Sequence, residues 1–76
     1  MVSSGYVTAL IDQWATETHD PQSKMTRQIQ KGDVVYIFEV MTVRTDRGAE
    51  LRGKTYMKDW ITLEDFSGEH LVVNSF

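Results

Sequence analysis

The stretch that decides the fold is residues 32–43, which read Gly-Asp-Val-Val-Tyr-Ile-Phe-Glu-Val-Met-Thr-Val. Nearly every residue in it is β-branched, aromatic or long and apolar, and these types favour a β-strand. A single glutamate, Glu39, interrupts the apolar run, which is typical of a strand buried over much of both faces. We therefore expect a central strand here, with shorter strands arranged around it.

A polar loop and a short strand are predicted before that stretch. Residues 16–24 are predicted to form the loop, because Pro21 fixes its own φ and disfavours the helical region for the residue before it. Residues 25–30 follow as a short strand, with Met25 and Ile29 expected to point inward. A glycine-containing turn then leads into the central strand.

The chain after the central strand is predicted to form a hairpin followed by two more strands. Residues 44–48 have the polar composition and terminal glycine of a hairpin loop, and residues 49–56 return as an antiparallel strand. Gly53 in the middle of that strand predicts a bulge or a close approach of the backbone. Residues 60–63 and 70–73 are predicted as the last strands.

The N-terminal segment, residues 6–15, is compatible with two structures. Alternation of Val7, Ala9 and Ile11 favours a strand. Helical spacing is found instead for a second set of residues: Val7, Leu10, Ile11 and Trp14. The alternative to an all-β barrel is therefore an α+β fold, in which a helix at about residues 6–16 packs on a four-stranded curled sheet.

Three short motifs resemble Src-homology-3 domains. Residues 9–12, Ala-Leu-Ile-Asp, resemble the Ala-Leu-Tyr-Asp opening of the eukaryotic domains. Residues 31–37 begin with Lys-Gly-Asp and resemble the turn and strand start of the same family. Residues 58–63, Lys-Asp-Trp-Ile-Thr-Leu, are similar to the Gly-Trp-Ile/Val-x-Leu strand of the bacterial-type repeats, with Asp59 in place of the glycine.

This resemblance implies an all-β fold, a five-stranded Src-homology-3-like barrel formed by a single domain over residues 1–76. Its core barrel would cover about residues 6–73, with a strand at residues 6–15 in place of the helix. Ligands of such a domain would lie between the 16–24 loop and the 44–48 loop.

The composition is that of an ordinary globular domain with a net charge of −3. The chain contains no cysteine, so disulfides and thiolate metal sites are excluded. No apolar run approaches the roughly 20 residues of a membrane span. The first residues lack the features of a signal peptide, and the expected location is cytoplasmic by default.

Catalytic chemistry has few candidate residues. The two histidines, His19 and His70, each lie beside an acidic residue, but no nucleophile elbow or phosphate-binding glycine loop accompanies them. The acidic residues near them lack the ordered spacing of a calcium or zinc site. We therefore expect no enzyme activity, no metal and no cofactor.

Binding through exposed aromatic residues is the favoured function. Aromatic side chains near loops often anchor partners, because they combine a large apolar area with a polar tip. The predicted partner-binding residues are Trp60, Trp14 and Tyr56, with the loop acids Glu17 and Asp20. Together they predict a non-catalytic protein-interaction module, or a small structural subunit of a larger assembly, that binds a protein or peptide through an aromatic and acidic groove.

Single-stranded nucleic acid is the alternative ligand. A barrel that presents basic residues beside an aromatic side chain can bind single strands. The predicted hairpin of residues 44–58 carries five basic residues: Arg44, Arg47, Arg52, Lys54 and Lys58. The acidic pI of about 5.2 opposes phosphate binding and makes this the less favoured prediction.

Overall fold

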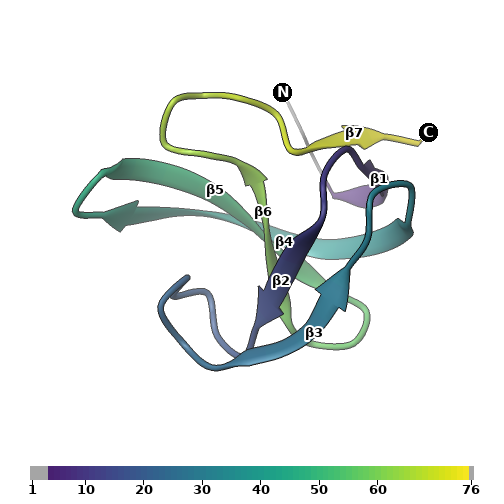
Figure 1. The fold of residues 1–76 in the computed structure, drawn as a ribbon, viewed down its shortest axis with the longest axis horizontal. Helices are drawn as coiled ribbons and strands as arrows, with labels where there is room; N and C mark the ends of the chain where they lie inside the picture. The colour runs from purple at the N-terminus through teal and green to yellow at the C-terminus, as the bar shows by residue number, and fades with distance from the viewer. Residues whose placement is uncertain (1–3, 76) are drawn as a thin grey trace.

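The computed structural model describes residues 4–75, and every regular element in that part is a β-strand. The seven strands are β1 (Gly5–Ala9), β2 (Gln13–Thr16), β3 (Met25–Ile29), β4 (Val34–Thr45), β5 (Gly48–Thr55), β6 (Trp60–Glu64) and β7 (Val72–Asn74). They form one antiparallel sheet in the order β3-β2-β6-β5-β4-β1-β7, curled into a half-barrel (Figure 1). The predicted all-β class is confirmed, with seven strands in place of five.

The N-terminal segment is extended, as predicted, but it forms two strands. β1 pairs with β4 and β7, whereas β2 pairs with β3 and β6, so the chain changes neighbours between them. At the break the backbone nitrogen of Leu10 donates to the carbonyl oxygen of Leu71 at 2.9 Å. The carboxylate of Asp12 accepts a hydrogen bond from the backbone nitrogen of Lys31 at 2.7 Å. The single strand predicted over residues 6–15 is therefore wrong in its continuity, and the alternative helix is not formed.

The core fills the concave side of the curled sheet. Its buried members are Val7, Ala9, Ala15, Ile29, Val35, Ile37, Ile61, Leu63 and Val72. The close approach predicted at Gly53 is confirmed, because a Cβ atom there would lie 3.0 Å from Ile37 Cγ2 and 3.0 Å from Leu63 Cδ1. A side chain at this position would push against atoms that are already fully buried.

β4 is buried on one face only, so the prediction of a strand buried on both faces is wrong. Val35 and Ile37 are buried, whereas Val34 is 59% exposed and Phe38 is 58% exposed. No element of the described residues covers the outer side of this part of the sheet. The inward orientation predicted for Met25 is also wrong, since Met25 is 61% exposed, while Ile29 is buried as expected.

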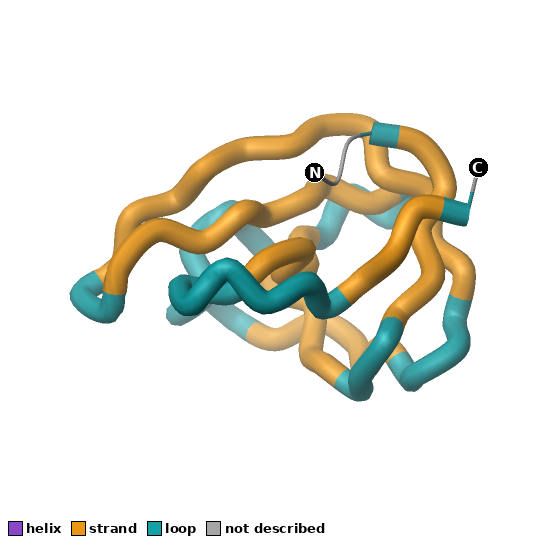
Figure 2. The backbone as a smooth tube through the Cα atoms, turned by 90° about the horizontal axis from the view of Figure 1, so that it is seen from above, coloured by secondary structure: helices purple, strands orange, loops and turns teal. Residues whose placement is uncertain are grey.

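β4 pairs with strands in both halves of the sheet because it bends. A register shift between Ile37 and Glu39 marks a bulge, which increases the local twist. Before the bulge β4 pairs with β1, and after it the strand continues along β5 to a tight turn at residues 46–47. Figure 2 shows this hairpin projecting from the rest of the molecule. The predicted 44–48 loop is thus shorter than expected.

The side chain of Gln13 joins β2 to β6. Backbone pairing between these strands is limited to Thr16 opposite Trp60. Further along, Gln13 Nε2 donates to the carbonyl oxygen of Thr62 at 2.9 Å, and Gln13 Oε1 accepts from the backbone nitrogen of Thr62 at 2.8 Å. The amide therefore makes the pair of bonds that a peptide group makes in a sheet.

A helix able to cross a membrane is absent from residues 4–75.

Candidate functional site

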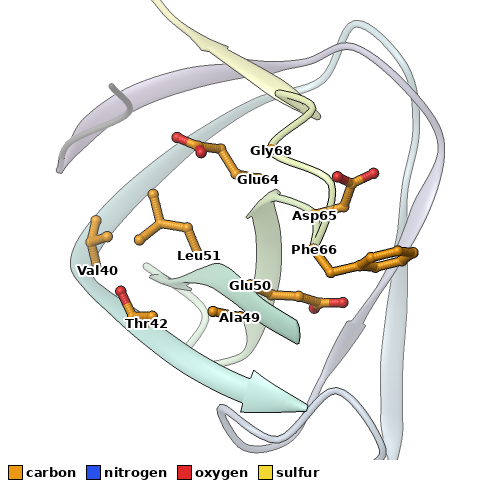
Figure 3. Close-up of a pocket in the computed structure, with 9 residues that line it drawn as sticks. All are labelled: Val40, Thr42, Ala49, Glu50, Leu51, Glu64, Asp65, Phe66 and Gly68. Carbon is orange, nitrogen blue, oxygen red and sulfur yellow. The ribbon is translucent and has the colours of Figure 1, made fainter. Parts of the chain in front are cut away.

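A hollow of about 350 Å³ lies between the β4–β5 hairpin and the loop that follows β6 (Figure 3). It is lined by Val40, Thr42, Ala49, Glu50, Leu51, Glu64, Asp65, Phe66 and Gly68. We call it the acid-rimmed hollow, because three of its lining residues are carboxylic acids and none is basic.

The floor of the acid-rimmed hollow continues the apolar core. Val40 and Leu51 are partly buried and pack against the core cluster. In Figure 3 their side chains point toward one another, and Glu64 projects above them. The hollow exists because the β4–β5 hairpin extends past the end of the packed core, which leaves its concave side partly uncovered.

One end of the hollow is fixed by contacts between the hairpin tip and the loop. The guanidinium of Arg47 lies 5.8 Å from the centroid of the Phe66 ring, a cation–π distance. A Cβ atom at Gly48 would lie 3.4 Å from Cβ of Phe66, so backbone and side chain are close there. Gly48 also has a φ of +134°, a conformation that other residues rarely adopt.

The acidic groups of the hollow have different local partners. Glu64 Oε2 lies 3.6 Å from Nδ1 of His70. Glu50 Oε1 is 3.5 Å from the hydroxyl of Thr62 and faces away from the floor. Because Glu64 projects above the floor and Glu50 faces away from it, Glu64 is the better placed of the two to meet a ligand that covers the floor.

Asp65 organises the loop that borders the hollow. Its Oδ1 accepts hydrogen bonds from the Ser67 hydroxyl at 2.6 Å, the Ser67 nitrogen at 2.9 Å and the Glu69 nitrogen at 3.0 Å. The hydrogen bond from the Ser67 side chain is the largest of the effects that lower the pKa of Asp65. The rim thus keeps this negative charge at neutral pH.

A second candidate surface is a group of aromatic rings on the outer side of the sheet. A shallow hollow of about 450 Å³ is lined by Tyr6, Tyr36, Phe38 and Tyr56. The ring centroids of Tyr6 and Tyr36 are 4.9 Å apart, and those of Tyr36 and Phe38 are 5.2 Å apart, both edge-to-face. Tyr6, Phe38 and Tyr56 are each more than half exposed. We call this group the aromatic face.

The residues predicted to bind a partner lie in different parts of the molecule. Tyr56 belongs to the aromatic face, and Trp14 is 51% exposed on β2. Glu17 and Asp20 are exposed in the loop between β2 and β3, where the sequence placed them. Trp60 is only 8% exposed, so its ring offers little surface to a partner.

Trp60 is buried beneath the 16–24 loop. Its ring centroid lies 6.0 Å from that of His19, which belongs to the loop. The buried guanidinium of Arg52 holds the same loop, since Arg52 Nε donates to the carbonyl oxygen of His19 at 3.3 Å. Arg52 also donates to the hydroxyl of Thr62 at 2.7 Å and to the hydroxyl of Thr16. Burial is the main cause that lowers the pKa of Arg52.

An ion pair lies at the turn between β5 and β6. Arg27 Nε donates to Asp59 Oδ2 at 2.7 Å, and Thr26 donates to the same oxygen at 2.9 Å. The hydroxyl of Thr55 donates to Oδ1. Burial raises the pKa of Asp59, but the hydrogen bonds from Arg27, Thr55 and Thr26 outweigh it, so the pKa is lowered overall.

The basic hairpin proposed for nucleic acid does not present all of its charges. Arg52 is 2% exposed and its donors are used within the fold. Arg47 lies over Phe66 at the hairpin tip. Arg44 and Lys58 are exposed, and Lys54 is half-buried.

No group of three or more His, Asp or Glu side chains within residues 4–75 could hold a metal ion.

Tyr6, Tyr36 and Phe38 were not among the predicted site residues. The signal was available in residues 34–38, where valine, tyrosine and phenylalanine occupy alternate positions and two β-branched residues lie between them. Such alternation is typical of a strand with one exposed face. The alternation is easily overlooked because every residue from Val34 to Phe38 is apolar or aromatic.

Comparison with protein-family models, with curated proteins and with solved structures finds no match to this chain. The fold therefore defines its class at a coarse level, as a small antiparallel β-protein with a curled sheet and two open surfaces.

Proposed function

We propose that this chain is a non-catalytic, Src-homology-3-like interaction module that binds a basic and apolar segment of a partner protein in the acid-rimmed hollow. The single observation that carries the proposal is the composition of that hollow. An apolar floor is bordered by carboxylates, and its lining contains no basic residue.

The floor supplies the apolar part of recognition. Val40 and Leu51 form a surface that is open above and rigid below, because both side chains pack on the core. An aliphatic side chain of a partner would exclude water from them and gain about 25 cal/mol for each Å² of apolar area that is buried. A pre-formed surface of this kind loses little side-chain entropy on binding.

The rim supplies the orientation and the charge preference. Glu64 stands beside the floor, and Asp65 is held in the adjoining loop by three hydrogen bonds to one of its oxygens. A lysine or arginine next to the docked apolar residue would meet the Glu64 carboxylate at the edge of the hollow, whereas the Asp65 carboxylate points away from the floor and adds negative charge to the rim. Complementary charge of this kind mainly increases association rate and selects against acidic partners.

The fold is consistent with the Src-homology-3-like part of the proposal. A hairpin of β2 and β3 carries a long loop, and β4 bends so that it pairs with β1 at one end and β5 at the other. The hollow lies beside the β4–β5 turn, one of the two loops between which the resemblance places ligands.

The proposal is tested by titration with two matched peptides at low ionic strength. The first contains one leucine between two lysines, and the second replaces both lysines by glutamates. Chemical-shift changes in the NMR spectrum should map to the hollow for the lysine peptide and be absent for the glutamate peptide. Equal binding of both peptides, or shifts confined to other surfaces, would refute the proposal.

A matched pair of variants locates the charge effect. Glu64→Gln removes a rim carboxylate and should lower the affinity for the lysine peptide by up to about fivefold, since an exposed ion pair contributes at most about 1 kcal/mol. Glu39→Gln removes an exposed carboxylate that lies outside the hollow and should leave the affinity unchanged. The same loss in both variants would indicate a net-charge effect instead of a site.

A single-stranded oligonucleotide is the third probe. Tight binding that weakens steeply with salt would favour the nucleic-acid alternative, because neutralised phosphates release counterions. The involvement of Arg52 in the fold removes one of the five cations on which that alternative depended.

A further inference from the structure

The register of the sheet places an uncharged row of side chains on the outer side of β1, β4 and β7. Tyr6 pairs with Tyr36, and Thr8 pairs with both Val34 and Val73. Directly paired residues lie on the same face of a sheet, and so do alternate residues of one strand. The intervening residues of these strands belong to the core: Val7, Ala9, Val35, Ile37 and Val72. The outer row therefore points away from the core as a single surface.

This row carries the aromatic face and extends it. Val34 is 59% exposed and Val73 is 49% exposed, so apolar surface reaches from the aromatic rings to β7 at the sheet edge. The bulge at Phe38 adds a further ring, which is 58% exposed and packs edge-to-face on Tyr36. Exposed apolar surface of this continuity marks an interaction site.

The charge of the surface selects its partner. The chain carries a net charge of −3, yet the paired outer row of β1, β4 and β7 consists of tyrosine, valine and threonine, and Phe38 extends it. Beside Phe38, the exposed Glu39 lies opposite Lys54 of β5. Two copies of an acidic protein repel one another over most of their surfaces, but here they can meet through uncharged side chains, and the charges at the border, Glu39 and Lys54, are of opposite sign. A two-fold axis would set each aromatic ring against rings of the same kind.

A nucleic acid is less well matched to the same rings. Stacked bases bring phosphates, which need free cations beside the aromatic residues. The guanidinium nearest to the rings is that of Arg27, 5.7 Å from the centroid of Tyr56. Asp59 already holds it in an ion pair at 2.7 Å.

We infer that the aromatic face is a self-association surface, through which two copies of this chain form a symmetric dimer. This interface lies on the outer side of β1 and β4 and leaves the acid-rimmed hollow open in both copies. It is independent of the proposed peptide binding.

Sedimentation velocity over rising protein concentration tests the inference, with Phe38→Lys as the disruptive variant. The unchanged chain should convert reversibly from monomer to dimer. Lysine at position 38 would bring an uncompensated charge into an apolar interface and raise the dimer dissociation constant at least about tenfold. Met25→Lys is the control, because Met25 is 61% exposed on β3, outside the aromatic face. It should dimerise like the unchanged chain.

Salt and circular dichroism complete the design. An apolar interface keeps or gains strength as salt rises, so a dimer that dissociates at high salt would overturn the inference. A monomer at every concentration up to about 1 mM would overturn it as well. So would equal dimerisation of Phe38→Lys and the unchanged chain. Circular dichroism confirms that both variants are folded, and peptide binding by Phe38→Lys tests the hollow separately.

Discussion

The outer face of the sheet is exposed in one half of the molecule and covered by a loop in the other. Over β1 and β4 the outer face is aromatic and open, and Phe38 and Tyr6 are more than half exposed. Over β5 and β6 the outer face is covered by the 16–24 loop, and it buries Arg52 and Trp60. A charged residue is thus buried in one half while large aromatic residues are exposed in the other.

The difference shows that burial in a chain of this size depends more on whether a loop covers the sheet than on the type of residue. The loop that crosses β5 and β6 offers carbonyl and hydroxyl oxygens to Arg52, which makes its burial tolerable. Within residues 4–75 no loop crosses β1 and β4, so apolar rings remain at the surface there. Substitutions under the loop should therefore lower the free energy of unfolding strongly, and those on the aromatic face should change it little.

The largest effect is expected for Trp60→Ala. Removing a nearly buried tryptophan from beneath the loop should lower the free energy of unfolding by about 3–5 kcal/mol. Trp14→Ala is the control, since Trp14 is 51% exposed, and should cost less than about 1 kcal/mol. Urea denaturation measures both. Similar losses in the two variants would contradict the comparison; Trp60→Phe provides a milder variant if Trp60→Ala does not fold.

The next effect in size is expected for Arg52→Ala. The change removes the donors that hold His19 and Thr62 and leaves a cavity, with an expected loss of about 3 kcal/mol. Amide hydrogen exchange should accelerate in the 16–24 loop more than in β4 and β1. Arg44→Ala, an exposed position, should change neither quantity. Uniform acceleration across the chain would mean that the loop is not held by this side chain.

Asp59→Asn should lower the free energy of unfolding by about 2 kcal/mol at neutral pH. The folded pKa of Asp59 is lowered, so its stabilising effect is present above the unfolded pKa of about 3.9 and is lost as the pH falls through the folded value. The difference in free energy of unfolding between Asp59→Asn and the unchanged chain should therefore become smaller as the pH is lowered below about 4. Chemical denaturation across that range measures it, and a constant gap would exclude the ion pair as the cause.

The smallest effect is expected on the open half. Phe38→Ser replaces an exposed ring and should change the free energy of unfolding of the monomer by less than about 1 kcal/mol. Thermal unfolding at low protein concentration measures it, because self-association would otherwise add to the apparent stability. A loss comparable to that of Trp60→Ala would show that the aromatic face is part of the core.

Much of the fold was predictable from local sequence. The strand-favouring run at residues 32–43, the turns around it and the close approach at Gly53 all follow from residue type and spacing. The break between β1 and β2 did not follow. It depends on Asp12 and Leu10 meeting Lys31 and Leu71, which are distant in the sequence.

The candidate sites were less predictable, because burial of one residue depends on segments far along the chain. Trp14 and Trp60 are the same residue type near comparable loops, yet only Trp60 lies under one. Arg52 was predicted to be available to a ligand, because it lies in an alternating strand. Its side chain instead donates to oxygen atoms of β2, β6 and the 16–24 loop. Tertiary register, which no single-sequence pattern contains, separates these cases.

Gln13 has a consequence for how this sheet resists unwanted pairing. Its backbone lies opposite Ile29 of β3, while its side chain bonds to both backbone groups of Thr62 on β6. One residue thus belongs to two ladders, and beyond the backbone pair of Thr16 and Trp60 its amide joins β2 to β6. Any substitution that lacks this donor and acceptor would leave both backbone groups of Thr62 without these partners, and a strand of another molecule could then add there.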